Sequence, residues 1–317
     1  MSDSERLSGQ VVKAQSGFFW VETERGLIRT QIPGRLKQER KGTDIVAVGD
    51  YVELDTPDGE HGMIAHVAPR VRVLSRARPA ANARQVRHDR EQVLVANVDQ
   101  VVFVLAVKNP QPSLRKLDRF LVVAEQHGIP AIICVNKIDL VPPGSAVAMF
   151  DLYARLGYAV IYTSAQRGEG VAALRALLAG KLTVFAGSSG VGKSSLLNAV
   201  QPDLGLRVRA VSAATGKGMH TTRFAELIPL DGGGYVADTP GIRGLAIYDV
   251  EPAEIDGYFR EIAPLVADCR FNDCTHRQET GCAVRRAVEE GSISPARYDS
   301  YLRLREEHQL LDDEAFG

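Results

Sequence analysis

Residues Leu182-Thr183-Val184-Phe185-Ala186-Gly187-Ser188-Ser189-Gly190-Val191-Gly192-Lys193-Ser194 decide the fold of this chain. The first five are apolar or β-branched and predict a buried strand, and a helix is expected to begin near Lys193. The segment between them fits the pattern G-x-x-x-x-G-K-[ST], whose backbone N–H groups, lysine and hydroxyl hold nucleotide phosphates and Mg²⁺. Strand, loop and helix together predict a nucleotide site in an α/β domain.

A second motif, Asn136-Lys137-Ile138-Asp139, comes before this loop in the chain. It follows the apolar run 131–135, so a parallel sheet would deliver it to the same edge as the loop. The Asp139 carboxylate can accept hydrogen bonds from N1–H and N2–H of guanine, an edge that adenine does not present. The two motifs predict GTP rather than ATP as the ligand. The alternative is that Asn136 and Asp139 only cap the following turn.

Two further segments are expected to contact the γ-phosphate. The loop 215–223 is bracketed by glycines and reads as a switch loop, in which either Thr221 or Thr222 contacts Mg²⁺. In Asp238-Thr239-Pro240-Gly241, which resembles the DxxG motif of GTP-binding proteins, Asp238 would hold Mg²⁺ through water and the Gly241 N–H would contact the γ-phosphate.

The full predicted GTP-binding set also includes Lys193 on the β- and γ-phosphates, Ser194 on Mg²⁺ and Ser164-Ala165 behind the base. It consists of Asn136, Lys137, Asp139, Ser164, Ala165, Gly187, Ser188, Ser189, Gly190, Val191, Gly192, Lys193, Ser194, Ser195, Thr221, Thr222, Asp238 and Gly241.

Ile242 stands where Ras-like enzymes carry the glutamine that orients the attacking water, and an apolar side chain cannot do so. Hydrolysis is therefore expected to need another group. His220 is the hypothesis for this catalytic role, because an imidazole can orient or deprotonate water. The alternatives are that His220 contacts a partner or packs locally, or that a partner supplies the group.

The order of these motifs differs from that of an ordinary GTPase, which runs phosphate loop, DxxG, NKxD. Here the NKxD motif comes first, then the loop, then DxxG, so the parts are circularly permuted. Because a sheet depends on which strands touch, joining the old ends and opening a surface loop can preserve the site.

The length of 317 residues predicts about two domains with room for a small third. Short β-rich runs predict an N-terminal five-stranded β-barrel of the OB-fold type over residues 1–75, suited to RNA binding. A basic linker is expected over 76–96, the α/β GTPase domain over 97–247 and a mostly α-helical zinc-binding domain over 248–317. Ser113 is expected to cap a helix over 114–126, and Ser294-Pro295 to begin one ending near Leu311.

Net charge is −1, yet basic residues cluster over 25–41 and 70–90 whereas residues 251–317 are acidic on balance. Any surface for phosphate groups is therefore expected in the first third, unless these are only charged exposed loops.

No apolar run approaches the roughly 20 residues that cross a membrane, and no apolar signal follows Met1. We expect a cytoplasmic protein without membrane association.

Cys269, Cys274, His276 and Cys282 form the pattern C-x₄-C-x-H-x₅-C. Cytosolic location disfavours disulfides, and three thiolates with one imidazole supply the tetrahedral set of a structural Zn²⁺. The alternative is ordinary reduced cysteines with a surface histidine.

The chain as a whole resembles the RsgA/YjeQ family of circularly permuted GTPases. The resemblance rests on the barrel, NKID, TSA (163–165), GSSGVGKS, DTPG followed by isoleucine, and the cysteine pattern. The resemblance implies a GTP hydrolase that acts late in small ribosomal subunit assembly, is stimulated by the subunit and binds 16S rRNA, here as an expected monomer. The chain departs from the family at Thr221-Thr222-Arg223, where family members often carry a third threonine. It also departs at Met219, where a basic residue is common. The competing hypotheses are an RNA-binding assembly module with a structural nucleotide, and a kinase or ATPase.

Overall fold

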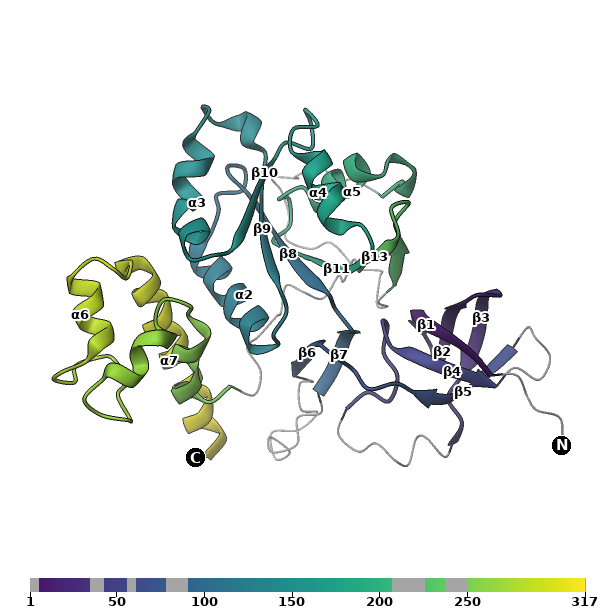
Figure 1. Ribbon diagram of the computed structural model, residues 1–317, viewed down its shortest axis with the longest axis horizontal. Helices are drawn as coiled ribbons and strands as arrows, with labels where there is room; N and C mark the ends of the chain where they lie inside the picture. The colour runs from purple at the N-terminus through teal and green to yellow at the C-terminus, as the bar shows by residue number, and fades with distance from the viewer. Residues whose placement is uncertain are drawn as a thin grey trace.

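The computed structural model describes residues 6–34, 43–55, 61–77, 91–206, 226–237 and 250–316. A small barrel and a helical C-terminal part lie on opposite sides of a central α/β domain (Figure 1). In these ranges, none of the helices combines the length and apolar character needed to span a membrane.

The N-terminal part is a closed barrel, as predicted, with the strand order β1-β2-β3-β5-β4 and β1 paired again with β4. Phe19 is buried in the barrel core, whereas Phe18 and Trp20 are partly exposed, as pleat alternation predicts. The strands are β1 (Arg6–Gln15), β2 (Phe18–Thr23), β3 (Gly26–Gln31), β4 (Tyr51–Asp55) and β5 (His61–Val67).

Residues placed in the expected linker 76–96 take part in a two-stranded antiparallel sheet of β6 (Val73–Ala77) and β7 (Glu91–Ala96). The structure does not describe the residues between these strands. Leu74 on β6 and Val95 on β7 are both buried in the large core that extends through the central domain. Both ends of the expected linker therefore form β-strands rather than an irregular connection.

The central domain contains one six-stranded sheet in the order β10-β9-β8-β11-β13-β12, parallel except for β12. Strand order reverses between β8 and β11, so the loop after β11 leaves the sheet where α/β folds bind ligands. The strands are β8 (Gln100–Ala106), β9 (Ala131–Asn136), β10 (Ala159–Thr163), β11 (Lys181–Ala186), β12 (Leu227–Pro229) and β13 (Gly234–Ala237).

Helices cover both faces of this sheet because its central strands are apolar on both sides. Side chains of β8 alternate between two cores: Phe103 packs with α2 and α3, and Val102 packs with α4 and α5. Ser113 caps α2 as predicted and accepts a hydrogen bond from the Lys116 N–H at 3.4 Å. The helices are α2 (Leu114–Gln126), α3 (Ser145–Arg155), α4 (Val171–Leu178) and α5 (Lys193–Val200), with 3₁₀ turns η2 (Ile138–Leu140) and η3 (Pro202–Leu204).

The C-terminal part is helical, as predicted, and α7 begins at Pro295 and continues past the expected end near Leu311. Two 3₁₀ helices precede the cysteine cluster. The elements are η5 (Pro252–Tyr258), η6 (Ala263–Asp268), α6 (Ala283–Glu289) and α7 (Pro295–Phe316).

A buried ion-pair network attaches this C-terminal part to the central domain. Arg297 of α7 donates to Asp118 of α2 at 2.7 Å and to Glu261 at 2.6 Å, and its side chain is 1% exposed. The Tyr153 hydroxyl of α3 donates to the same Asp118 carboxylate at 2.7 Å. The three charges are desolvated together, so their pairing fixes where α7 lies on α2 and α3.

Candidate nucleotide site and metal centre

The phosphate loop adopts backbone conformations that require glycine at two positions. Gly187 and Gly192 have φ angles of 150° and 100°. A Cβ at Gly187 would lie 2.3 Å from the Val104 carbonyl oxygen, and one at Gly192 would lie 2.3 Å from Asn136 Nδ2. The loop therefore turns tightly against β8 and the end of β9, with α5 beginning at Lys193 as predicted.

Asn136 joins the NKID motif to the phosphate loop. Its Nδ2 donates to the Val191 carbonyl at 2.9 Å, and its Oδ1 accepts from the Ala165 N–H at 3.2 Å. The side chain is buried, so these bonds form in a low-dielectric environment where they hold geometry well. Asn136 is thus more than a cap on its own turn, because it connects three segments that surround the expected ligand.

Lys137 also contacts the phosphate loop. Its Nζ donates to the Gly190 carbonyl at 2.6 Å and to the Asn109 carbonyl. Burial lowers the pKa of Lys137, and the nearby Asp139 carboxylate acts in the opposite direction. Lys137 therefore bonds the NKID motif to the phosphate loop at Gly190.

Asp139 is held by Ser164. The Ser164 hydroxyl donates to Asp139 Oδ1 at 2.6 Å and accepts from the Arg167 N–H at 3.2 Å. Within the described part of the chain, Asp139 Oδ2 accepts no hydrogen bond. One carboxylate oxygen is therefore fixed by the protein, and the other is available to the N–H groups of a guanine.

Lys193 folds over the phosphate loop. Its Nζ donates to the carbonyls of Gly187 at 2.8 Å and Ser188 at 3.1 Å. Ser194 and Ser195 occupy the first turn of α5 and are partly exposed. An ammonium group at this position can reach phosphate oxygens placed above the loop.

The remaining predicted contacts lie outside the described residues. They are His220, Thr221, Thr222, Asp238 and Gly241. Their roles at magnesium, γ-phosphate and water remain predictions.

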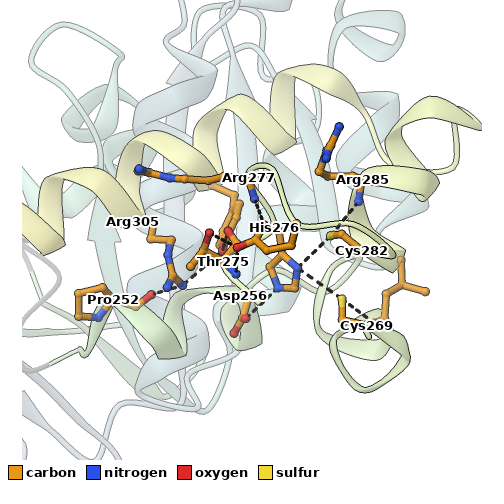
Figure 2. Close-up of polar contacts among 12 residues, drawn as sticks. Pro252, Asp256, Cys269, Thr275, His276, Arg277, Cys282, Arg285 and Arg305 are labelled. Carbon is orange, nitrogen blue, oxygen red and sulfur yellow. Dashed lines mark hydrogen bonds and ion pairs between the residues drawn. The ribbon is translucent and has the colours of Figure 1, made fainter. Parts of the chain in front are cut away.

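Cys269, Cys274, His276 and Cys282 converge in the C-terminal part, with one potential ligand atom from each within 4.8 Å of the others. His276 Nδ1 lies 3.5 Å from Cys269 Sγ and 3.3 Å from Cys282 Sγ (Figure 2). His276 is fully buried, which excludes the alternative of a surface histidine. The four side chains match a Cys₃His set that could hold a metal ion.

Asp256 completes this cluster, and sequence reasoning missed it. From η5, its Oδ2 lies 3.1 Å from His276 Nε2, on the opposite side of the imidazole from the thiols (Figure 2). A carboxylate there fixes the tautomer that leaves Nδ1 free to bind a metal. The only sequence signal is an acidic residue 20 positions before the histidine, which no spacing rule singles out.

The Cys274 thiol is buried, and its charge state would depend on whether a cation is bound. Burial raises the pKa of the Cys274 thiol to about 12, so without positive charge nearby this group is neutral at pH 7. A divalent metal reverses this preference and deprotonates its thiol ligands.

The binding loop itself is ordered by Glu279, which sequence reasoning also missed. Its carboxylate accepts from the N–H groups of Thr275 at 2.7 Å, Arg277 at 2.8 Å and Gln278 at 2.9 Å. Burial raises the pKa of Glu279, but bonds from Thr275 and from backbone N–H groups outweigh it and lower the pKa to about 2. A stable carboxylate thus holds the turn that presents His276.

Comparison with known proteins gives consistent matches over nearly the whole chain. Residues 67–248 match the family described as RsgA GTPase, and residues 8–64 match the RsgA N-terminal domain. Small ribosomal subunit biogenesis GTPase RsgA of Gemmatimonas aurantiaca is 45% identical over 303 residues, covering 95% of this chain and 97% of that protein. The protein of the same name from Caldanaerobacter subterraneus is 40% identical, covering 95% of each.

Two solved structures have the same architecture. YjeQ from Thermotoga maritima superposes with a TM-score of 0.77 at 38% identity, covering 96% of this chain and 99% of that one. YloQ, described as a circularly permuted GTPase, superposes with a TM-score of 0.73 at 32% identity, covering 96% of each chain.

Proposed function

The chain belongs to the RsgA family of GTPases, and on that premise we propose that it hydrolyses GTP to GDP and phosphate as a late assembly factor of the small ribosomal subunit. The contact that most supports this proposal is the one between its two separated motifs. Asn136 bonds to the loop at Val191, while one carboxylate oxygen of Asp139, three residues on, accepts no hydrogen bond from the residues that the structure describes. Guanine and phosphates would therefore be bound by one connected unit.

Phosphoryl transfer on this scaffold depends on positioning and charge. Lys193 and the N–H groups of residues 187–194 would stabilise negative charge on the transferred group. Ser194 and Asp238 would hold Mg²⁺, which when bound neutralises charge on the β- and γ-phosphate oxygens. Because Ile242 cannot orient water, His220 or a group from the partner would do so, and a group from the partner would explain stimulation by that partner.

The metal cluster is proposed to be a structural Zn²⁺ site. Cys269, Cys274, His276 and Cys282 provide four protein ligands, so a tetrahedral ion would have no open position for a substrate. Its role would be to fold the segment that carries α6 and to hold it against α7.

The barrel is proposed to contact 16S rRNA in the cytoplasm, with the protein acting as a monomer. Phe18 supports this, because the exposed guanidinium of Arg29 stacks 3.8 Å from its ring centroid on the outer face of the barrel. Such an aromatic and cationic pair suits stacking on bases and pairing with phosphates. Trp20 instead packs against the large core that includes Val12 and extends through the central domain, so it is not assigned to this surface.

Steady-state GTP hydrolysis with purified ribosomal subunits tests the proposed activity. Small subunits should raise the rate by an order of magnitude or more and large subunits should not, since a partner that completes a site gives increases of this size. Lys193→Ala should abolish hydrolysis. An unstimulated rate would favour an assembly module with a structural nucleotide, and equal hydrolysis of ATP would favour an ATPase.

A further inference from the structure

The hairpin β12–β13 connects the two segments that are predicted from the sequence to contact the γ-phosphate. Glu226, at its start, follows the switch segment 215–223, and Ala237, at its end, directly precedes Asp238. On its other side β13 pairs in parallel with β11, where Ala237 lies opposite Val184. A displacement of either phosphate-contacting segment would therefore act directly on this hairpin.

Two adjacent barrel strands contact this hairpin. Lys13 of β1 forms an antiparallel bridge with Glu226, and its Nζ lies 3.1 Å from Glu226 Oε1. The Tyr235 hydroxyl of β13 donates to Glu22 Oε2 of β2 at 2.5 Å. Burial and the Glu22 carboxylate raise the pKa of Tyr235 to about 12, so its hydroxyl remains a donor at pH 7. The barrel therefore contacts the hairpin at two places, at Glu226 directly before β12 and at Tyr235 in β13.

A β-bulge in β1 makes this contact possible. The register with β2 shifts between Val11 and Lys13, so the intervening Val12 leaves the barrel core. Val12 is buried instead in the core shared with Leu74 and Val95, while Val11 stays inside the barrel. Bulges redirect side chains in this way, and this one turns β1 toward the central sheet.

We propose that Lys13–Glu226 and Glu22–Tyr235 couple the barrel to the nucleotide site, so that nucleotide state alters the barrel and a partner on the barrel alters GTP hydrolysis. This inference rests on the proposed function for its partner. The Lys13 and Glu226 side chains are 32% and 54% exposed, so their ion pair adds little to stability. Its use is then to set the register between barrel and hairpin rather than to hold the fold together.

Charge reversal tests this coupling without a ribosome. Lys13→Glu and Glu226→Lys each place like charges together, and the double variant restores an ion pair. Hydrogen exchange over residues 6–23 is compared with a GTP analogue and with GDP bound. In the wild type, exchange should differ between the two states by about fivefold or more. Each single variant, and Tyr235→Phe, should remove the difference, and the double charge swap should restore it.

Arg6→Glu is the matched control, because Arg6 pairs with Glu53 of β4 on the barrel surface, and the described residues place no hairpin side chain against it. It should leave the nucleotide-dependent difference intact. Equal exchange in both nucleotide states of the wild type, or a difference that survives all three single variants, would overturn the coupling.

Small-subunit stimulation of the same variants gives a second readout. At saturating subunits the single reversals should lose about fivefold or more of the stimulated rate and the swap should recover it, with unstimulated hydrolysis unchanged. Stimulation retained in both single reversals would contradict the inference while leaving the proposed function intact. Wild-type protein that no subunit stimulates would refute the proposed partner, and hydrogen exchange would still decide the coupling.

Discussion

Asn136 and Val191 are 55 residues apart in the chain, yet their hydrogen bond holds together the two halves of the nucleotide site. Sequence spacing predicted both motifs, because each is a short run with its own chemistry. It could not predict that Gly192 must lack a Cβ in order to admit the Asn136 side chain. That requirement arises only when β9 and β11 lie in one sheet.

Asp139→Asn should exchange guanine for xanthine specificity. The Asp139 carboxylate can accept hydrogen bonds from both guanine N–H groups. The NH₂ group of an asparagine would instead face the guanine amino group, and two donors repel each other. The same NH₂ group can donate to the C2 carbonyl of xanthine. GTP affinity should fall by roughly 10²-fold or more and XTP affinity should rise. Titration with labelled nucleotides measures both. The exposed Asp151→Asn is the matched control and should change neither, and unchanged GTP affinity in Asp139→Asn would contradict the assigned base contact.

Asp256→Asn should weaken metal binding. The amide can still accept from His276 Nε2 but carries no charge to support the imidazole, and changes of this kind cost about 10- to 100-fold in metal affinity. Competition with a chelator, with zinc content measured alongside, gives the affinity. Asp268→Asn, an exposed change just before Cys269, should have no effect. Equal zinc affinity in both variants would show that the Asp256 contact is incidental.

At the scale of elements, strong periodicity and flanking signals made the sheet and its covering helices predictable. Ser113 capped α2 where expected, and the apolar runs at β8, β9 and β11 formed the central strands. The 3₁₀ helices η5 and η6 and the β6–β7 sheet were not predicted. Short 3₁₀ segments carry no usable period, and the β6–β7 pairing depends on Leu74 and Val95 packing in the core that extends through the central domain.

Arg297→Met should strongly destabilise the docking of α7. Removing the guanidinium leaves Asp118 and Glu261, at 3% and 7% side-chain exposure, without their counter-charge. Breaking a buried pair in this way costs about 3–5 kcal/mol. Urea unfolding measures it, with Arg303→Met as control, since Arg303 pairs with Asp299 on the surface and should contribute about 1 kcal/mol or less. Similar losses in both variants would contradict a docking role for the network.

Across the whole molecule, the order of the motifs predicts a link from the DxxG segment to the metal-binding part, because residues 238–241 are the last expected nucleotide contact and lead along the chain toward Cys269. Movement of that part on loss of the γ-phosphate stays a prediction, since residues 238–249 are outside the described structure. What the described residues add is the second link, from the hairpin β12–β13 to the barrel. Sequence could not reveal it because Lys13 and Glu226 meet only in the folded protein.

The central proposal is that this protein acts as a GTPase on the small ribosomal subunit, and we expect it to bind the subunit with GTP and to leave after hydrolysis. Cosedimentation with small subunits, large subunits and whole ribosomes, in a non-hydrolysable GTP analogue and in GDP, tests it most directly. We predict that the protein pellets with small subunits in the analogue and stays largely in the supernatant in GDP. Equal pelleting in both nucleotides, or preferential pelleting with large subunits, would contradict the account.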